Sequence, residues 1–255
     1  MPSQLDERKQ KILKAVIADY LETAEPVGSR RISKKFDLNI SPATIRNEMA
    51  DLEEAGYIVQ PHTSAGRIPS DKGYRFYVDE LMKEKKLSLR ELSLIRKQLQ
   101  KIGRNIDGLL HESLKILSNL SQYVTVLTAP DIRYHHEKVY ASGISNIVKL
   151  PEFKNLENLK HLLSMIEHED ILVHLLNEYA ESDATIVKIG NENKLKEIRD
   201  CSIVVTTYHF SIGSLGTLGV IGPTRMSYDK VTGLLNSMAE ELTHSLRGGD
   251  ESDQG

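Results

Sequence analysis

Three polar side chains near the start of one predicted helix could read the bases of DNA. Thr44, Arg46 and Asn47 follow Ser41, a favourable N-cap. Arginine bonds guanine O6 and N7, and asparagine bonds adenine N6 and N7. Ala43 lies on the same face and is small, so a DNA backbone could approach closely. The pattern predicts a recognition helix that enters the major groove with its N-terminus first.

The start, the end and the buried face of this helix are all visible in the sequence. Pro42 stands at the first helical position, where its missing N–H costs nothing, and Gly56 is a favourable stop. Helical spacing gives it an apolar face made of Ile45, Met49 and Leu52. Asp51 and Glu54 lie in its C-terminal half, where they would repel phosphates. The N-terminal half is therefore the expected contact surface.

Two helices are predicted before the recognition helix, and they would position it. The first has Ser3 as its N-cap and Asp6 in its first turn, and the segment 25–28 ends it. Ser29 is expected to cap the second helix, whose outer face carries Arg30, Arg31, Lys34 and Lys35. We expect Ser29, Arg30 and Arg31 to hold phosphates.

Strand-like residues and a polar turn follow the recognition helix. Residues 57–60 read as a strand, residues 61–66 as a turn, and a further helix begins near Ser70. This is the pattern of a β-wing, and it predicts a winged helix-turn-helix domain over residues 1–86. The wing side chains expected at phosphate or the minor groove are His62, Thr63, Ser64 and Arg67.

Two long stretches of the chain resemble the heat-inducible transcription repressor HrcA family. The first includes EPVGS at 25–29, SPATIRNEMADLEEAGY at 41–57 and HTSAGRIPSDKGYRFYVD at 62–79. The second includes PEF at 151–153, IGNEN at 189–193, Cys201-Ser202 and GVIGPTRM at 219–226 with Tyr228. Both stretches occur in the family's order, so the resemblance is specific.

The resemblance implies both a fold and a function. It implies a winged helix-turn-helix followed by a GAF-like domain. It also implies a homodimeric repressor of chaperone operons that binds the inverted-repeat element CIRCE on double-stranded DNA and depends on the GroEL chaperonin. The matched recognition positions are Ser41, Ala43, Thr44, Arg46 and Asn47, and the matched wing positions are 62–67.

The chain departs from the family pattern in its middle. After residues 125–130 the family runs through further GAF-like strands and an inserted dimerising segment, whereas here residues 141–147 follow about ten residues later. Residues 87–118 are predicted as one long helix that begins with a capping box, Ser88 to Glu91. It carries apolar residues in 3-4 spacing at Leu92, Ile95, Leu99, Ile102, Ile106 and Leu109. Such a seam either packs inside its own domain or replaces the missing dimer contact.

The remaining chain predicts a shortened GAF-like α/β domain over residues 119–248. Strands are expected at 123–127, 185–189, 202–206 and 217–221, one or two helices at 156–176, and a final helix after Ser227. Residues 249–255 are expected to be a disordered tail. The overall fold class is therefore α+β, with an N-terminal winged helix-turn-helix joined by a long helix to the GAF-like domain.

Composition excludes some classes of protein but does not identify a catalytic or binding activity. The net charge is −3, with +1 on residues 1–86 and −4 on residues 87–255, so bulk charge does not indicate DNA binding. The single cysteine excludes an intrachain disulfide. No apolar run is long enough to span a membrane, and the N-terminus has no signal-peptide h-region. We expect a cytoplasmic protein.

No catalytic, cofactor or metal site is predicted. The glycines of 213–219 do not form a nucleotide-binding pattern and lead into a strand, so a hairpin is the expected structure. The spacing of His161, His168 and His174 is not a metal pattern. His135-His136 reads as a solvated connection, and Cys201 as a buried small residue. We expect a protein that is not an enzyme.

Two other functions remain open from the sequence. The first is a winged-helix regulator that senses a small ligand in its GAF-like domain. The second is an interaction module whose helix-turn-helix no longer binds DNA. A ligand that raises the melting temperature would favour the former, and the absence of salt-dependent DNA binding would favour the latter.

Overall fold

The chain forms two compact units in the computed structural model, which describes residues 5–131, 136–179, 184–211 and 214–247. The first unit contains Met1–Lys83 together with Thr224–Ser227, and the second contains Glu84–Pro223 and Tyr228–Gly255. The boundary lies close to the one expected after residue 86. Thr224–Ser227, however, belongs to the first unit and not to the C-terminal domain in which the sequence placed it.

The first unit has the order of elements that the sequence predicts. Three helices are followed by a short antiparallel β-hairpin, in which Ile58 pairs with Pro69 and Val59 with Ile68, and then by a further helix that continues into a π-helical turn. The bounds are α1 Glu7–Thr23, α2 Ser29–Lys35, α3 Pro42–Glu54, β1 Ile58–Val59, β2 Ile68–Pro69, α4 Asp71–Phe76 and the turn Tyr77–Leu81.

Helix ends in this unit confirm some local predictions and correct others. Asp6 caps α1 and accepts a hydrogen bond from Lys9 N, so the proposed cap at Ser3, which lies outside the described residues, is wrong. Gly28 occupies the N-cap position of α2, and Ser29 is its first helical residue. The earlier cap at Ser29 is therefore also wrong, because helical geometry begins at that residue.

Apolar faces of α1, α2 and α3 meet in one core. The residues of this core are Ile12, Leu13, Val16 and Ile17 of α1, Ile32 of α2 and Ile45, Met49 and Leu52 of α3, and all of them are buried. The predicted face of α3 is confirmed. Ile58 and Tyr74 extend the buried set to the hairpin and α4.

A five-stranded antiparallel sheet is the centre of the second unit. The strand order is β4-β3-β7-β6-β5, and β6 and β7 pair along most of their length as a hairpin. The bounds are β3 Val124–Asp131, β4 His136–Ser142, β5 Ile186–Ile189, β6 Cys201–Ser211 and β7 Ser214–Pro223. The predicted strands are present, and β4 adds one that begins at His136, which the sequence had placed in a connection.

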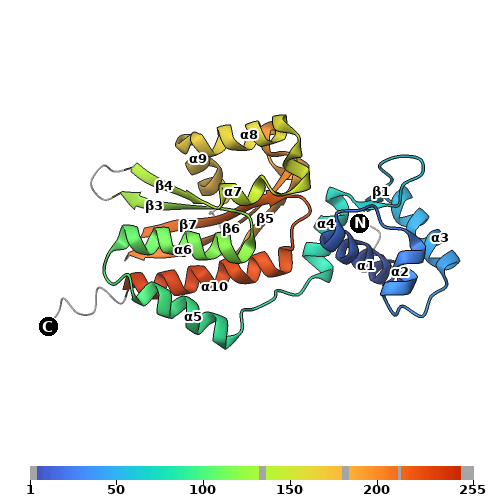
Figure 1. Cartoon of the computed structure of the whole chain (residues 1–255), viewed down its shortest axis with the longest axis horizontal. Helices are drawn as coiled ribbons and strands as arrows, with labels where there is room; N and C mark the ends of the chain where they lie inside the picture. Colours follow the sequence, from blue (N-terminus) through green and yellow to red (C-terminus); the bar gives the residue numbers. More distant parts are fainter. Residues whose placement is uncertain (1–4, 132–135, 180–183, 212–213, 248–255) are drawn as a thin grey trace. The chain divides into compact units, whose positions relative to one another are not determined.

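Helices cover both faces of this sheet, so the α+β class is confirmed. Helices α5, α6 and α10 lie on one side, and α8 and α9 lie on the other (Figure 1). The bounds are α5 Leu89–Gln100, α6 Ile106–Ser121, α7 Ile144–Ile147, α8 Leu156–Glu167, α9 Glu169–Tyr179 and α10 Tyr228–Arg247. Two helices therefore occupy the region 156–176.

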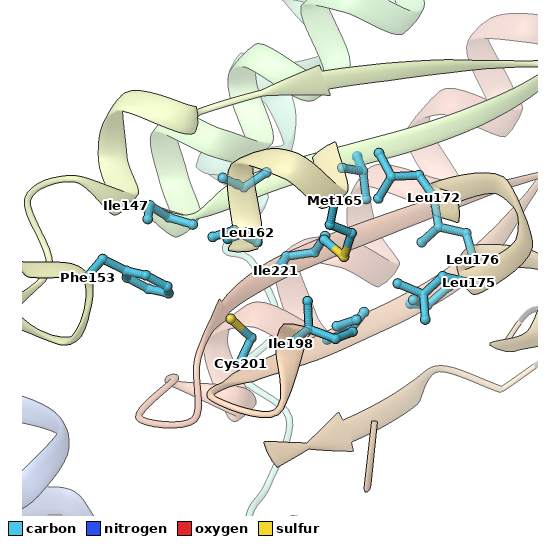
Figure 2. Close-up of a cluster of buried hydrophobic side chains, with 14 residues drawn as sticks. Ile147, Phe153, Leu162, Met165, Leu172, Leu175, Leu176, Ile198, Cys201 and Ile221 are labelled. Carbon is cyan, nitrogen blue, oxygen red and sulfur yellow. The ribbon is translucent and has the colours of Figure 1, made fainter. Parts of the chain in front are cut away.

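Apolar side chains fill the space between the sheet and helices α8 and α9. Figure 2 shows Leu162 and Met165 of α8 and Leu172 of α9 facing Ile221 of the sheet. Cys201 belongs to the same cluster and is buried, as the sequence predicts. Burial of this cluster is the main source of stability on this face.

The predicted continuous helix over 87–118 is wrong. Helix α5 begins at the predicted capping box of Ser88 and Glu91, but it ends at Gln100, and α6 begins at Ile106. Gly103 adopts a left-handed conformation in between (φ +65°), and Asn105 caps the new helix. The apolar spacing continues across the break because both helices turn their apolar sides inward, where Ile95, Leu99 and Leu109 are buried in their own unit.

Among the described residues no helix is long and apolar enough to cross a membrane. The expected disordered tail, His135 and Gly213 lie outside the described residues.

Candidate nucleic-acid interface

The recognition helix α3 is fixed at both ends by local interactions. The Ser41 side chain accepts a hydrogen bond from Thr44 N at 3.1 Å, and Pro42 stands in the first turn. At the other end Gly56 is left-handed (φ +78°), and Tyr57 N donates to Leu52 O. These caps fix where the exposed N-terminal half of the helix begins.

The N-terminal half of α3 presents the predicted base-reading side chains to solvent. Ala43, Arg46 and Asn47 are exposed. Within the described part of the chain, neither Arg46 nor Asn47 has a hydrogen-bonding or ionic partner. Thr44 differs, because it is half-buried and its hydroxyl lies 2.9 Å from Ser41 Oγ. The guanidinium and the carboxamide are therefore available to a ligand.

Cations from α1 pair with two acidic residues of α3, Glu48 and Asp51. Lys9 Nζ lies 2.9 Å from Glu48 Oε2 and 3.1 Å from Asp51 Oδ2, and Arg8 Nη1 lies 3.2 Å from Glu48 Oε1. The hydrogen bond to Glu48, followed by that to Asp51, raises the pKa of Lys9 above its ordinary value. The repulsion of phosphates that the sequence predicts for Asp51 is therefore reduced within the fold.

Helix α2 is held to α1 by a buried carboxylate. Asp19 is fully buried, and its oxygens lie 2.8 Å from Arg31 Nε and 2.8 Å from Lys35 Nζ. Arg31 also bonds Glu25, and these acids raise its pKa. Arg31 therefore serves an internal ion pair, whereas its neighbour Arg30 is exposed.

Ser29, predicted to hold phosphate, is nearly buried. It is only 8% exposed, because it begins α2 on the side of the helix that packs inward. It is not the cap of α2, and its contact with phosphate stays a prediction. Among the cations predicted on α2 to hold phosphates, Arg30 is the one with an exposed side chain, because Arg31 is drawn to Asp19.

The wing is built from backbone contacts and one arginine. Val27 and Arg67 exchange two backbone hydrogen bonds, of 2.8 and 2.9 Å, so residue 27 pairs with the chain entering β2. Gly66 permits this approach, because a Cβ there would lie 2.6 Å from the backbone of Val27. Gln60 donates its side-chain amide to Thr63 O and Ala65 O and so shapes the turn.

Arg67 is directed toward α3. Its Nε lies 2.9 Å from Glu53 Oε2, and its Nη2 lies 2.8 Å from the same oxygen. The ion pair joins the wing to the recognition helix and engages the guanidinium expected at DNA. By contrast His62, Thr63 and Ser64 at the wing tip are exposed.

The sequence missed the residues that organise this surface. Asp19 could have been noticed in the sequence, because it places a carboxylate on the apolar face of α1, three residues after Val16. The pairing of Lys9 with Glu48 and that of Glu53 with Arg67 carried no local signal, since the two partners of each pair are 14 or more residues apart.

The glycine and histidine motifs considered in the sequence have local structural roles. The described residues contain no group of three or more His, Cys, Asp or Glu side chains placed to hold a metal ion. Gly216 and Gly219 lie within β7, where Gly216 makes room for the Tyr208 ring, so these two glycines permit close packing in the sheet. His168 bonds the backbone oxygen of Ser164.

Comparison with known proteins supplies the family. Residues 131–232 match the family model described as HrcA protein C terminal domain. The chain is 35% identical to the heat-inducible transcription repressor HrcA of Desulforamulus reducens, over 95% of this chain and 97% of that protein. It is 36% identical to the protein of the same name from Carboxydothermus hydrogenoformans, over 95% and 98%.

A solved structure supports the fold independently. A crystal structure described as that of a hypothetical protein superposes with a TM-score of 0.76 at 20% identity, covering 96% of this chain and 98% of that chain.

The length of the alignment is relevant to the shortened GAF-like domain that the sequence predicts. It runs over 338 positions for the Desulforamulus protein, although this chain has 255 residues, so this relative contains residues inside the aligned region that the present chain lacks. Identity of this level over nearly the whole chain leads to one conclusion: the chain belongs to the heat-inducible transcription repressor HrcA family.

Proposed function

We propose that the chain represses chaperone operons by binding the CIRCE inverted repeat as a homodimer through α3 and the wing. The observation that carries this proposal is the division of charge on α3. Among the described residues, Arg46 and Asn47 are exposed without internal partners, whereas Glu48, Asp51 and Glu53 are paired with cations of the same unit. Glu54, the remaining acid of α3, is exposed at the C-terminal end of the helix. The N-terminal half of such a helix offers donors and acceptors to bases while presenting little net negative charge to phosphates.

Individual residues take different roles in this proposal. Arg46 and Asn47 read base edges, and Ala43 allows close approach of the helix to the groove. Arg30 and the wing-tip residues His62, Thr63 and Ser64 contact the DNA backbone or the minor groove. Arg31 and Arg67 act indirectly, by fixing α2 and the wing to the rest of the unit.

Homodimer formation follows from the symmetry of the operator. An inverted repeat presents two equivalent half-sites, which two copies of one chain related by a two-fold axis can occupy. We propose that heat relieves repression through loss of the folded or dimeric state, or through diversion of GroEL to unfolded proteins. The dependence on GroEL is carried over from the family resemblance.

Fluorescence anisotropy with a CIRCE-type duplex and a scrambled duplex, over a series of salt concentrations, tests the proposal. We expect preferential binding to the inverted repeat, with two chains per duplex and an affinity that falls as salt rises. Weak and equal binding to both duplexes would contradict sequence-specific recognition. Addition of GroEL to the operator complex then tests the chaperonin dependence.

Regulation by a small ligand is the alternative, and the packing between the sheet and helices α8 and α9 does not favour it. The layer between the sheet and helices α8 and α9 is filled by buried apolar side chains, including Phe153, Leu176 and Ile198 (Figure 2). A ligand there would have to displace packed side chains. A compound that raises the melting temperature of the protein would nevertheless support this alternative.

A further inference from the structure

The segment 222–228 belongs to both units, its two ends to the second and its middle to the first. At its ends, Pro223 pairs with Cys201 in the sheet, and the buried Tyr228 hydroxyl lies 2.7 Å from Ser202 Oγ. Between them, Thr224–Ser227 is part of the first unit. The first unit therefore includes a piece of chain that is covalently continuous with β7 and α10.

Arg225 in this piece contacts the end of α1. Its Nη1 donates a hydrogen bond of 2.7 Å to Leu21 O. Leu21 lies in the last turn of α1, where carbonyl groups lack intrahelical partners and the helix dipole is negative. The last turn of α1 contains no basic residue of its own, so Arg225 supplies the cation that the helix lacks. Met226 beside it is fully buried.

The end of α1 that Arg225 contacts also holds α2. Asp19, two residues before Leu21, pairs with Arg31 and Lys35 of α2. At its other end, α1 pairs with Glu48 and Asp51 of α3 through Lys9. The position of α1 therefore sets the positions of both helices of the helix-turn-helix.

We propose that Arg225 is a positioning residue for DNA recognition, which fixes α1 and through it the recognition helix. The inference rests on the proposed DNA-binding function. Arg225 would act through the helix that it contacts and not through a contact of its own with DNA.

The experiment compares three variants of the full chain. Arg225→Ala removes the cation, and Arg225→Lys keeps it without the guanidinium. Arg199→Ala makes the same change of charge at an exposed residue of the second unit. Amide hydrogen exchange of the C-terminal half of α1 reports the local effect, and anisotropy with the inverted-repeat and scrambled duplexes reports recognition, both well below the melting temperature.

We expect Arg225→Ala to lower protection in the C-terminal half of α1 by about three- to tenfold. Preference for the inverted repeat should fall by a similar factor, whereas binding to the scrambled duplex should change less. Arg225→Lys should recover part of both effects, and Arg199→Ala should cause neither. A uniform loss on both duplexes would indicate a smaller folded fraction and would overturn the positioning role.

Unchanged α1 protection in Arg225→Ala would overturn the inference directly. Reduced protection with an unchanged preference between duplexes would overturn it as well. If the unaltered protein shows no preference for the inverted repeat, the proposed function fails, and the protection of α1 still decides whether Arg225 fixes this helix.

Discussion

The ammonium group of Lys9 in α1 lies 2.9 Å from Oε2 of Glu48 in α3, and it also reaches Asp51 at 3.1 Å. One cation thus joins the first helix to the recognition helix and neutralises part of its acidic side. Residues 1–86 have a net charge of only +1, so attraction to DNA depends on where the charges lie. The pairing explains how a nearly neutral unit can present a surface without strong negative charge.

Replacement of Lys9 tests this explanation. We expect Lys9→Gln to weaken operator binding, although Lys9 is not expected to touch DNA, because the exposed Asp51 would lose its cation and Glu48 would keep only Arg8. The loss should be about 0.5–1 kcal/mol at low salt and smaller at high salt. Anisotropy over a salt series measures it. Lys14→Gln, at an exposed position of the same helix, provides the matched control.

The added change Glu48→Gln should restore part of the affinity lost in Lys9→Gln. Its restoring effect is the signature of a charge-neutralising role. Equal affinity of Lys9→Gln and the unaltered protein at low salt would contradict the role that we assign to Lys9.

Arg46 is the residue for which we expect the largest loss of sequence-specific binding. Arg46→Ala should cost about 1–3 kcal/mol on the inverted repeat and much less on a scrambled duplex, since a bidentate contact to guanine is lost. Stability should hardly change, because the side chain is exposed and has no internal partner among the described residues. Equal losses on the two duplexes would identify Arg46 as a phosphate contact.

Local signals in the sequence predicted α3 well, and long-range pairs explain what was missed. Ser41, Pro42 and Gly56 act within a few residues of where they stand, so the bounds of α3 follow from the sequence. Arg67 and Arg31 look free in a sequence, yet folding brings each to an acid. Only the folded chain shows which of the predicted cations remain exposed.

The break in the long helix and the placement of Thr224–Ser227 were missed for different reasons. The break near Gly103 was signalled by a glycine and the capping residue Asn105, but continued apolar spacing concealed it. By contrast, no local pattern places Thr224–Ser227 in a unit whose other residues end at Lys83. Assignment of that segment requires tertiary contacts such as the one between Arg225 and Leu21.

Gly66 should be essential for the wing. In Gly66→Ala the new Cβ would lie 2.6 Å from backbone atoms of Val27 and 2.7 Å from Pro26 C, so the backbone itself would have to move. We expect a loss of about 1–3 kcal/mol in the free energy of unfolding. Denaturant titration measures this loss, and anisotropy measures the accompanying change in DNA binding.

Gly28→Ser is the matched control for Gly66→Ala. A Cβ at Gly28 meets nothing within 4 Å, and serine is favourable at the N-cap of α2 that this residue occupies. Its stability should therefore stay within about 0.5 kcal/mol of the unaltered protein. Similar behaviour of the two variants would show that close packing at Gly66 is unimportant.

Cys201 should make stability depend on alkaline pH. Burial, with a smaller contribution from the charge of Asp200, raises the pKa of its thiol from 9.0 to about 12. Between these values the unfolded chain releases the proton while the folded chain keeps it, so stability falls as the pH rises through this window. The slope from this group approaches about 1.4 kcal/mol per pH unit.

Denaturant titrations of the unaltered protein and Cys201→Ala between pH 8 and pH 11 isolate that contribution, because all other titrating groups are shared. We expect the difference in unfolding free energy between the two proteins to shrink as the pH rises, since Cys201→Ala has no thiol to ionise. The same burial should protect the native thiol from iodoacetamide at pH 8, with alkylation appearing only where unfolding is observed. Rapid alkylation of the native protein, or a difference that is constant with pH, would mean that the thiol is accessible or titrates normally in the folded state.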